Sequence, residues 1–396
     1  MAVRYIDQVD VKGKRVFIRA DFNVPLDENC RITDDNRIRA TVPTLQYVLE
    51  HGGAVIAASH LGRPKGRRVP ELSLAPVARR LEELLGRPVR FADDCIGGEA
   101  RAAAAALQPG EVLLLENLRF YNEETANDEA FARKLAEPAD VFVSDAFAVS
   151  HRAHASVEAI TRFVPVCAAG FLMKKEITGF ERAMQAPERP LAAVIGGAKV
   201  SGKLEVLENI IRTVDALLIG GGMAFTFLKA RGIEVGNSMV EDDLLDTASS
   251  IMDTAEESGV ELLLPVDCVI AEELRRGVTT KTVSVEDIPR GWLGLDIGPE
   301  TVQAFSGVIA GAKTIVWNGP MGVFEFEEFS RGTCGIAEAI AASPGVSIVG
   351  GGDTDAALHR TGLQDRITFI STAGGAFMEM MKGTSLPGIA ALDRQG

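Results

Sequence analysis

This sequence lacks the cysteine pairs, the long apolar runs and the apolar leader that mark metal-binding, membrane and secreted proteins. Its five cysteines among 396 residues are odd in number and far apart, and no C-x-x-C pair suggests a zinc or redox site. No apolar run reaches the roughly 18 residues of a membrane span, and the first residues lack the apolar segment of a secretory signal. We therefore expect a cytoplasmic protein with buried free thiols and no membrane-embedded part.

Excess positive charge is also missing. The net charge of −14 argues against general binding to nucleic acids or anionic membranes. Residues 1–90 nevertheless contain 16 Lys and Arg against 11 Asp and Glu, a net charge of +5, so the remainder carries −19. A basic first part on an acidic chain indicates a local anion site, although a chance imbalance on solvated surfaces would give the same count.

The two common signatures of nucleotide binding are incomplete. Residues 197–204 read GAKVSGKL, which matches the P-loop pattern G-x-x-x-x-G-K until Leu204 replaces the hydroxyl residue that holds Mg²⁺. No G-x-G-x-x-G opens a helix with an acidic residue about 20 positions later, so a dinucleotide fingerprint is absent. We expect Leu204 to begin a helix and to belong to the core, so that Mg²⁺ must be bound elsewhere.

Short apolar runs alternate with amphipathic segments through nearly the whole chain. In the first half the expected buried strands are RVFIRADF, GAVIAAS, EVLLLEN and DVFVSDAF. A second series begins after residue 187 with LAAVIGG, ALLIGG, ELLLPVDCVI, TIVWNG, VSIVGGG and RITFIST. This pattern predicts the α/β class, with two doubly wound domains, each a mainly parallel sheet with helices on both faces. The segment between the two series has the apolar spacing of a connecting helix.

Polar and cationic side chains follow the expected strands of the first half. Ligands bind beyond the carboxyl ends of parallel strands, so these residues are candidates for a site. They are Asp21, Asn23, Arg37, His60, Arg63, Arg119, His151, Arg152 and His154. Convergent guanidinium groups suit a small phosphorylated carboxylate, because arginine presents a planar fork to oxyanions. Taken singly, each of these residues could instead be a surface ion pair or a packed ring, and the spacing in HRAH is poor evidence for zinc.

Glycine-containing turns follow five expected strands of the second half. They are IGGAKVSGK, LIGGGMAFTF, WNGPMGVFE, VGGGDTDAA and STAGGAFME. Glycine lets backbone N–H groups approach phosphates or a purine ring, and helix N-termini add positive potential. One such turn is commonly structural, whereas five in one domain predict a nucleotide site. There Asp353 could supply a carboxylate for Mg²⁺ and Thr354 a hydroxyl for phosphate.

At this point the chain resembles the phosphoglycerate kinases across nearly its full length. The matching stretches are RVFIRADFNVPLD, SHLGRP, ENLRFY, HRAHAS, GGAKVSGKLEVLENI, GGMAFTFL, DIGPETV, IVWNGPMGVFE and GGGDT. The resemblance implies a 3-phosphoglycerate-binding domain at 1–170, a connecting helix at 171–187, a nucleotide-binding domain at 188–383, and a tail at 384–396 that packs back on the first domain. It also implies a monomer whose domains close about a hinge.

The resemblance implies a role for each matching residue. The residues that would bind 3-phosphoglycerate, with Arg19 and His154 in the same basic patch, are Asp21, Asn23, Arg37, His60, Arg63, Arg119, His151 and Arg152. The residues that would bind the nucleotide are Lys199, Lys203, Glu325, Gly351, Gly352, Asp353 and Thr354. Among these, Glu325 would bind the ribose and Asp353 the Mg²⁺. The catalytic residues would be Arg37, Lys199 and Lys203, with Arg37 and Lys199 on the phosphoryl group during transfer.

The implied activity is reversible phosphoryl transfer between ATP and the carboxylate of 3-phosphoglycerate, giving 1,3-bisphosphoglycerate and ADP, by direct in-line transfer after domain closure. An ionised carboxylate is already a nucleophile, which explains the absence of an obvious Ser/His/Asp arrangement. Two rivals predict different residues. A P-loop NTPase requires a hydroxyl at 204, and an inactive nucleotide-binding regulator predicts loss of Lys199, Arg37 or Asp353, all of which are present.

Two stretches depart from the pattern that the resemblance implies. Residues 145–154 read DAFAVSHRAH instead of DAFGTAHRAH, which leaves His151 and Arg152 intact. Residues 371–376 read STAGGA instead of STGGGA, so Ala373 replaces a glycine of a turn expected near the nucleotide. The second departure puts the conformation of that turn in question.

Overall fold

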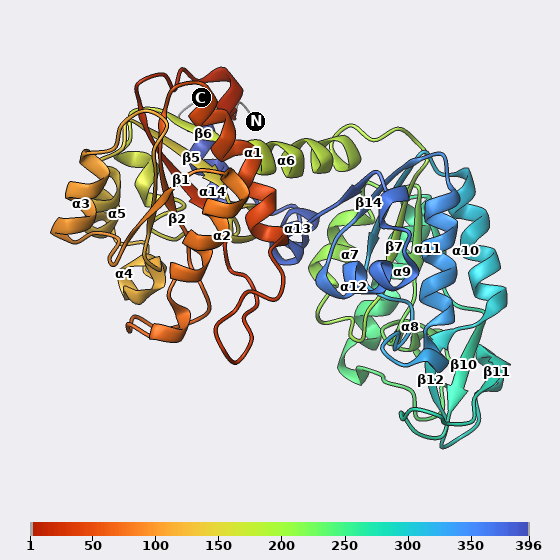
Figure 1. Cartoon of the computed structure of the whole chain (residues 1–396). Coiled ribbons are helices and arrows are strands. Elements are labelled where there is room, and N and C mark those ends of the chain that lie inside the picture. Colours follow the sequence, from red (N-terminus) through yellow and green to blue (C-terminus); the bar gives the residue numbers. More distant parts are fainter. Residues whose placement is uncertain (1–2, 395–396) are drawn as a thin grey trace. The chain divides into compact units, whose positions relative to one another are not determined.

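The computed structural model describes residues 3–394 and divides the chain into two compact units (Figure 1). Unit 1 contains residues 3–177 together with 385–394, and unit 2 contains residues 178–384. Helix α6 (Phe171–Met184) begins in unit 1 and ends in unit 2. Each unit has its own parallel sheet, which confirms the predicted α/β class. Within residues 3–394, no helix combines the length and apolar character needed to cross a membrane.

Unit 1 is built on a six-stranded sheet in the order β3-β4-β2-β1-β5-β6, in which all neighbours are parallel. Its strands are β1 (Arg15–Ala20), β2 (Ala54–Ala58), β3 (Val89–Ala92), β4 (Val112–Leu115), β5 (Val141–Asp145) and β6 (Cys167–Ala169). Its other helices are α1 (Asn36–Glu50), α2 (Ala75–Leu85), α3 (Gly98–Ala105), α4 (Asn122–Thr125), α5 (Glu129–Ala136) and α14 (Pro387–Asp393). From β1 the chain continues into β2 on one side of β1, and it later enters β5 on the other side of β1. The order of the strands in the sheet therefore reverses at β1.

The last helix, α14, packs within unit 1. The backbone N–H of Gly388 donates to the carbonyl of Ser150 at 2.9 Å. Beyond the helix, Arg394 Nη2 lies 3.0 Å from Glu158 Oε1. Burial raises the pKa of Glu158, but hydrogen bonds from Asn127 and Arg162 outweigh it and leave the pKa below its usual range, so this carboxylate is charged when it holds Arg394.

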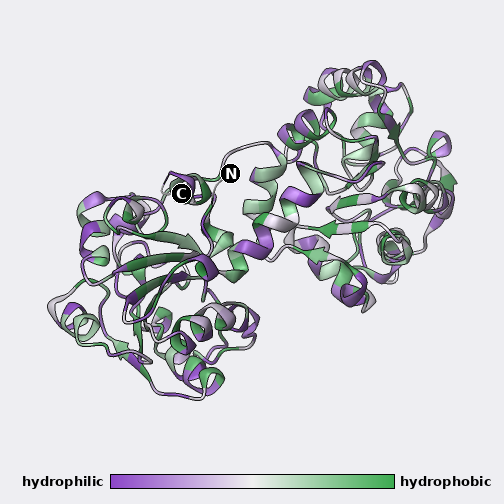
Figure 2. Ribbon diagram, turned by 90° about the horizontal axis from the view of Figure 1, so that it is seen from above, coloured by the Kyte–Doolittle hydropathy of each residue, from purple (hydrophilic) through white to green (hydrophobic). Residues whose placement is uncertain are grey.

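Unit 2 repeats the same design with the strand order β15-β14-β13-β7-β8-β9, again with all neighbours parallel. Its strands are β7 (Leu191–Ile195), β8 (Ala216–Ile219), β9 (Glu261–Leu263), β13 (Thr314–Asn318), β14 (Val346–Val349) and β15 (Phe369–Ile370). Its helices are α7 (Leu204–Ile210), α8 (Ala224–Ala230), α9 (Leu245–Glu257), α10 (Pro299–Gly311), α11 (Arg331–Ala342), α12 (Gly352–Thr361) and α13 (Gly374–Met381). The central strands of both units are buried and apolar, as the green ribbons of Figure 2 show. Here the order reverses at β7.

Two expectations about unit 2 were wrong. The stretch ELLLPVDCVI is not one strand, because Pro265 has no N–H for a sheet and separates β9 from β10 (Asp267–Ala271). β10 pairs antiparallel with β11 (Lys281–Ser284) and β12 (Leu293–Ile297) in a separate small sheet. Leu204 begins α7 as predicted, but its side chain is only half-buried, because the buried residues of that helix are Val206, Leu207 and Ile210.

A buried carboxylate connects the small sheet to α10. Asp267 on β10 is 4% exposed and accepts hydrogen bonds from Glu300 N at 3.0 Å, Thr301 N at 2.8 Å and Thr301 Oγ1 at 2.6 Å. The first N–H groups of a helix have no partner within the helix, and a carboxylate there also interacts favourably with the helix dipole. Asp267 therefore anchors the start of α10.

We predict that Asp267→Ala lowers the free energy of unfolding by about 2 kcal/mol, because it leaves the N–H groups of Glu300 and buried Thr301 without their carboxylate acceptor. Urea denaturation measures this loss. Asp253→Ala, at an exposed position in α9, is the control and should change the midpoint little. Equal stability of the two variants would show that Asp267 is not an anchor.

Candidate active site

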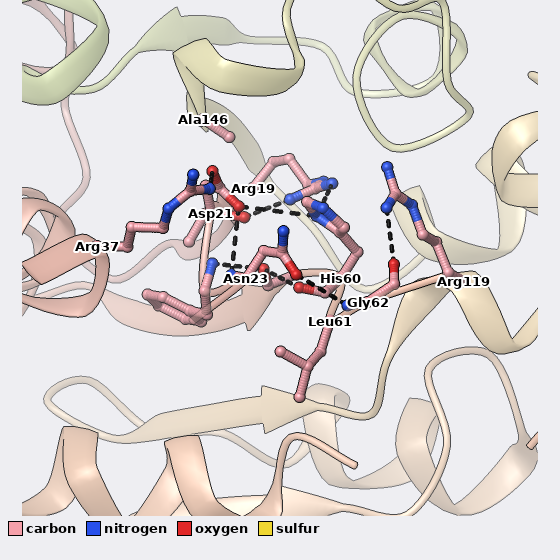
Figure 3. Close-up of polar contacts among 12 residues, drawn as sticks. Arg19, Asp21, Asn23, Arg37, His60, Leu61, Gly62, Arg119 and Ala146 are labelled. Carbon is pink, nitrogen blue, oxygen red and sulfur yellow. Dashed lines mark hydrogen bonds and ion pairs between the residues drawn. The ribbon is translucent and has the colours of Figure 1, made fainter. Parts of the chain in front are cut away.

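In unit 1, predicted residues meet at the carboxyl ends of β1 and β2. Arg37, in the first turn of α1, forms an ion pair through Nη1 with Asp21 Oδ2, and the two side chains point toward each other in Figure 3. Asn23 Oδ1 accepts a hydrogen bond from Gly62 N at 2.8 Å, which connects the segments that follow β1 and β2. His60 Nδ1 lies 3.8 Å from Asp21 Oδ1. The structure thus brings Asp21, Asn23, Arg37 and His60 together.

Beside these residues lies a cavity of about 440 Å³. The predicted residues that line it are Arg63, Arg119, Arg152 and His154, and sequence reasoning missed Lys65, Gly66, Tyr121, Asn122 and Thr125. Lys65 directly follows the SHLGRP stretch and Tyr121 is the last residue of the ENLRFY stretch, so their position was the available signal. His151 is not among the lining residues, but its Nε2 accepts a hydrogen bond from Arg152 Nε at 3.0 Å.

The cavity has excess positive charge, since no carboxylate is among the described residues that line it. Burial, together with the positive charges of Arg19 and Arg152, lowers the pKa of Arg119 to about 10. Arg119 Nη1 donates to the carbonyl of Gly62 at 2.9 Å, while its buried Nε has no hydrogen-bond partner among residues 3–394. Burial and neighbouring arginines lower the pKa of His154 to about 3. A bound anion would relieve this repulsion and supply the missing acceptor.

In unit 2, two glycines meet where β7 and β13 end side by side. A Cβ atom on Gly196 would lie 2.2 Å from the carbonyl oxygen of Pro320, and one on Gly319 would lie 2.2 Å from the carbonyl oxygen of Gly196. Gly319 also has φ +100°, which side chains of L-residues rarely adopt. Only glycine fits at these two positions, so the turns after the two strands can approach each other closely.

Next to these turns lies a pocket of about 350 Å³. Its glycines and its predicted side chains are Gly197, Gly221, Gly222, Gly294, Gly322, Glu325 and Asp353. Sequence reasoning missed its apolar walls, which are formed by Ala198, Met239, Leu274, Leu293, Leu295, Pro320, Val323 and Phe324. Met239 and Leu274 are 48% and 46% exposed, which is unusual for large apolar side chains and is the signal that the structure adds.

The remaining predicted residues of unit 2 do not line this pocket. Thr354 is buried, and its Oγ1 accepts a hydrogen bond from Gly319 N at 2.7 Å. Lys199 is exposed. Lys203 is partly buried, with Nζ 3.6 Å from Met378 Sδ, and burial lowers its pKa to about 8 although Asp353 opposes this shift. Gly351 and Gly352 form the start of α12.

Ala373 occupies its turn without strain. Its φ of −132° lies in the region open to any L-residue, so the position does not require glycine. The turn precedes α13 and is absent from the pocket lining. Of the five glycine-containing turns, the other four each contribute at least one residue to the pocket.

An anion cavity in one α/β unit and a glycine-lined pocket in another are typical of proteins that bind a phosphorylated compound and a nucleotide separately. A family model described as phosphoglycerate kinase matches residues 6–384. The chain is 57% identical to phosphoglycerate kinase of Geobacter metallireducens over 100% of both chains, and 53% identical to that of Moorella thermoacetica over 99% of both. The solved phosphoglycerate kinase of Coxiella burnetii superimposes with a TM-score of 0.94 at 42% identity, covering 99% of both chains. The chain belongs to the phosphoglycerate kinase family and is a kinase.

The lowered pKa of Lys203 predicts a pH-dependent stability. Between pH 8 and 10.5 the unfolded chain keeps the Lys203 proton while the folded chain loses it, so this residue makes stability rise with pH. We expect ligand-free Lys203→Met to be more stable than the parent at pH 7, by about 1–3 kcal/mol, with the difference shrinking toward pH 10. Urea midpoints across this range measure it, with exposed Lys313→Met as control. A constant difference would contradict the shift.

Proposed function

We propose that the protein catalyses reversible phosphoryl transfer between ATP and the carboxylate of 3-phosphoglycerate, giving 1,3-bisphosphoglycerate and ADP. The observation that carries this proposal is the division of chemistry between two sites. Unit 1 has a cavity with three arginines and no carboxylate among its described lining, whereas the glycine-lined pocket of unit 2 contains Asp353. The first suits a small polyanion and the second a metal-bound nucleotide.

The reaction needs positioning and charge neutralisation more than acid–base chemistry. The attacking carboxylate is ionised at neutral pH, so no side chain has to remove a proton. We assign 3-phosphoglycerate binding to the predicted residues of unit 1, which are Asp21, Asn23, Arg37, His60, Arg63, Arg119, His151 and Arg152. Arg37 is 43% exposed beyond its ion pair with Asp21, which leaves its guanidinium accessible to the phosphoryl group.

Nucleotide binding is assigned to unit 2. The apolar walls of the pocket suit the adenine ring, and Glu325, which also lines it, suits the ribose hydroxyls. Lys199, Lys203, Gly351, Gly352 and Thr354 would contact the phosphates. Because Thr354 Oγ1 already accepts from Gly319 N, its hydroxyl is left to act as a donor.

Asp353 is the residue that we expect to hold Mg²⁺. Within residues 3–394 no group of three or more His, Cys, Asp or Glu side chains could bind a metal ion by itself. Mg²⁺ in kinases commonly uses one or two carboxylates together with the phosphates of the substrate, so a single lining carboxylate is sufficient. Bound Mg²⁺ would neutralise charge on the phosphates, and Asp353 would orient it.

Direct in-line transfer requires both ligands to reach each other, so we propose that the units close about a hinge and exclude water from the reacting groups. We further propose that the protein acts as a monomer in the cytoplasm. An assay that couples ADP formation to the addition of 3-phosphoglycerate tests the activity. ADP formation that does not depend on 3-phosphoglycerate would refute the proposed acceptor.

Arg37→Ala should reduce turnover by about 10² to 10³, because one preorganised donor to the transferring phosphoryl group is lost. Binding of MgATP alone should change little, since Arg37 belongs to unit 1. Steady-state kinetics and calorimetric titration with MgATP separate the two effects. Arg39→Ala, which removes an exposed ion pair with Asp35 on the same helix, is the matched control. Near-normal turnover of Arg37→Ala would rule out its role.

Leu204→Ser and Asp353→Asn distinguish the two possible metal positions. Leu204→Ser restores the P-loop sequence pattern and should give no gain in Mg²⁺ affinity. Because Leu204 is half-buried, this variant should lose less than about 2 kcal/mol of stability. The second removes a hard anionic ligand and should raise the Mg²⁺ concentration needed for turnover while leaving the fold intact. The opposite pattern would place Mg²⁺ at the P-loop position.

A further inference from the structure

Arg19 on β1 is fully buried and lies under the basic cluster of unit 1. Its Nε donates to Ser156 Oγ at 2.7 Å, and Nη1 donates to the carbonyl of Ala20. Nη2 lies 3.3 Å from His60 Nδ1, a contact that Figure 3 shows. With no exposed surface, this guanidinium has no access to a ligand. Its influence on the site therefore passes through its charge and through the side chains that it contacts.

A buried carboxylate holds the guanidinium in place. Glu124 on α4 is fully buried, accepts from Ser156 N at 3.0 Å and from Ser156 Oγ at 2.6 Å, and lies 3.9 Å from Arg19 Nη2. Since the Ser156 hydroxyl donates its only proton to Glu124, it can only accept from Arg19 Nε. Burial lowers the pKa of Arg19, but Glu124 and Asp21 oppose this shift, so the guanidinium stays protonated.

A protonated guanidinium constrains the imidazole of His60. Arginine can only donate hydrogen bonds, so His60 Nδ1 must be the acceptor of the contact with Arg19 Nη2. The competing acceptor for an Nδ1 proton is Asp21, whose Oδ1 is farther away at 3.8 Å and whose Oδ2 is paired with Arg37. In a neutral imidazole whose Nδ1 accepts, the proton is on Nε2.

The surroundings also keep this ring neutral. Burial holds the pKa of His60 well below its usual range, and the charges of Arg19, Arg119 and Arg37 and the nearby His154 act in the same direction. Asp21 is the carboxylate that opposes them, at 3.8 Å from Nδ1. Among the interactions of the described residues, none involves His60 Nε2, and this nitrogen is not among the buried polar atoms that lack a partner.

We propose that Arg19 is a positioning residue that fixes His60 as the Nε2–H tautomer, so that His60 acts as a neutral hydrogen-bond donor to an oxygen of the anionic substrate. The tautomer follows from the contacts in unit 1 alone. The identity of the acceptor rests on the proposed function. Arg19 therefore contributes to the site without contacting the substrate.

Long-range ¹H–¹⁵N correlation of the imidazole rings tests the tautomer in the ligand-free protein. The chain has five histidines, and the His60 signals are those lost in His60→Gln. We expect a protonated Nε2 and an unprotonated Nδ1 that do not change between pH 8 and pH 5.5. A proton on Nδ1, or a titration to imidazolium within this range, would overturn the proposal.

A double variant tests the role of Arg19. Arg19→Met with Glu124→Gln removes both buried charges together, which avoids leaving one unpaired. With the folded state checked by circular dichroism, we expect the His60 signals to show a mixture of tautomers or a pKa nearer the usual imidazole value. An unchanged Nε2–H signature would show that Arg19 does not set the tautomer. Should this variant fail to fold, Arg19→Leu with Glu124→Gln, which also removes the donor to His60 Nδ1, is measured in the same way with the same two outcomes.

Kinetics tests the donor. The amide of glutamine can place an N–H near the position of Nε2, whereas the shorter asparagine reaches only the position of Nδ1. We expect the KM for 3-phosphoglycerate to be about tenfold higher in His60→Asn than in His60→Gln, which corresponds to one charge-assisted hydrogen bond. Equal values or the reverse order would overturn the donor role. If the unmodified protein shows no turnover with 3-phosphoglycerate, the proposed function is refuted. The tautomer of His60 is measured without ligand and can still be tested in that case.

Discussion

Both candidate sites depend on one constraint, which is the reversal of strand order within a parallel sheet. At β1 and β5 in unit 1, and at β7 and β13 in unit 2, the connections leave in opposite directions and expose the carboxyl ends of two neighbouring strands. Side chains and turns that follow the strands therefore meet at one edge. In unit 2 the meeting is close enough that Gly196 and Gly319 leave no room for a Cβ atom.

Each unit contains a partly buried cation that lowers the stability of the ligand-free protein. Arg119 and Lys203 are both partly desolvated, with pKa values lowered to about 10 and about 8, and each would be more stable beside a bound anion. Glu124 and Asp21 compensate part of the positive charge in unit 1, but they lie beneath or beside the cavity and do not line it. Such partly compensated cations are costly in the free protein and favour ligand binding.

The fold and much of the site composition were predictable because their signals are local. Strand and helix periodicity indicated the two parallel sheets, and Asp353 and Glu325, which both follow strands, line one pocket. The errors arose where distant segments decide the outcome. Pro265 separates β9 from β10, but only pairing with β11 and β12 places β10 in a separate antiparallel sheet. Leu204 is half-buried because the core contacts of α7 are made by later residues.

By itself, the sequence determined the α/β class, the glycines that permit close backbone approach, and the residue types at each strand end, since these depend on neighbours along the chain. Only the tertiary structure decided how those groups are used. It occupies Thr354 Oγ1 with Gly319 N, buries Lys203 beside Asp353, and turns the guanidinium of Arg19 toward His60 instead of toward solvent. The physical reason is that burial and hydrogen-bond partners are set by residues far apart in the chain, and these partners determine both charge and the direction of each donor.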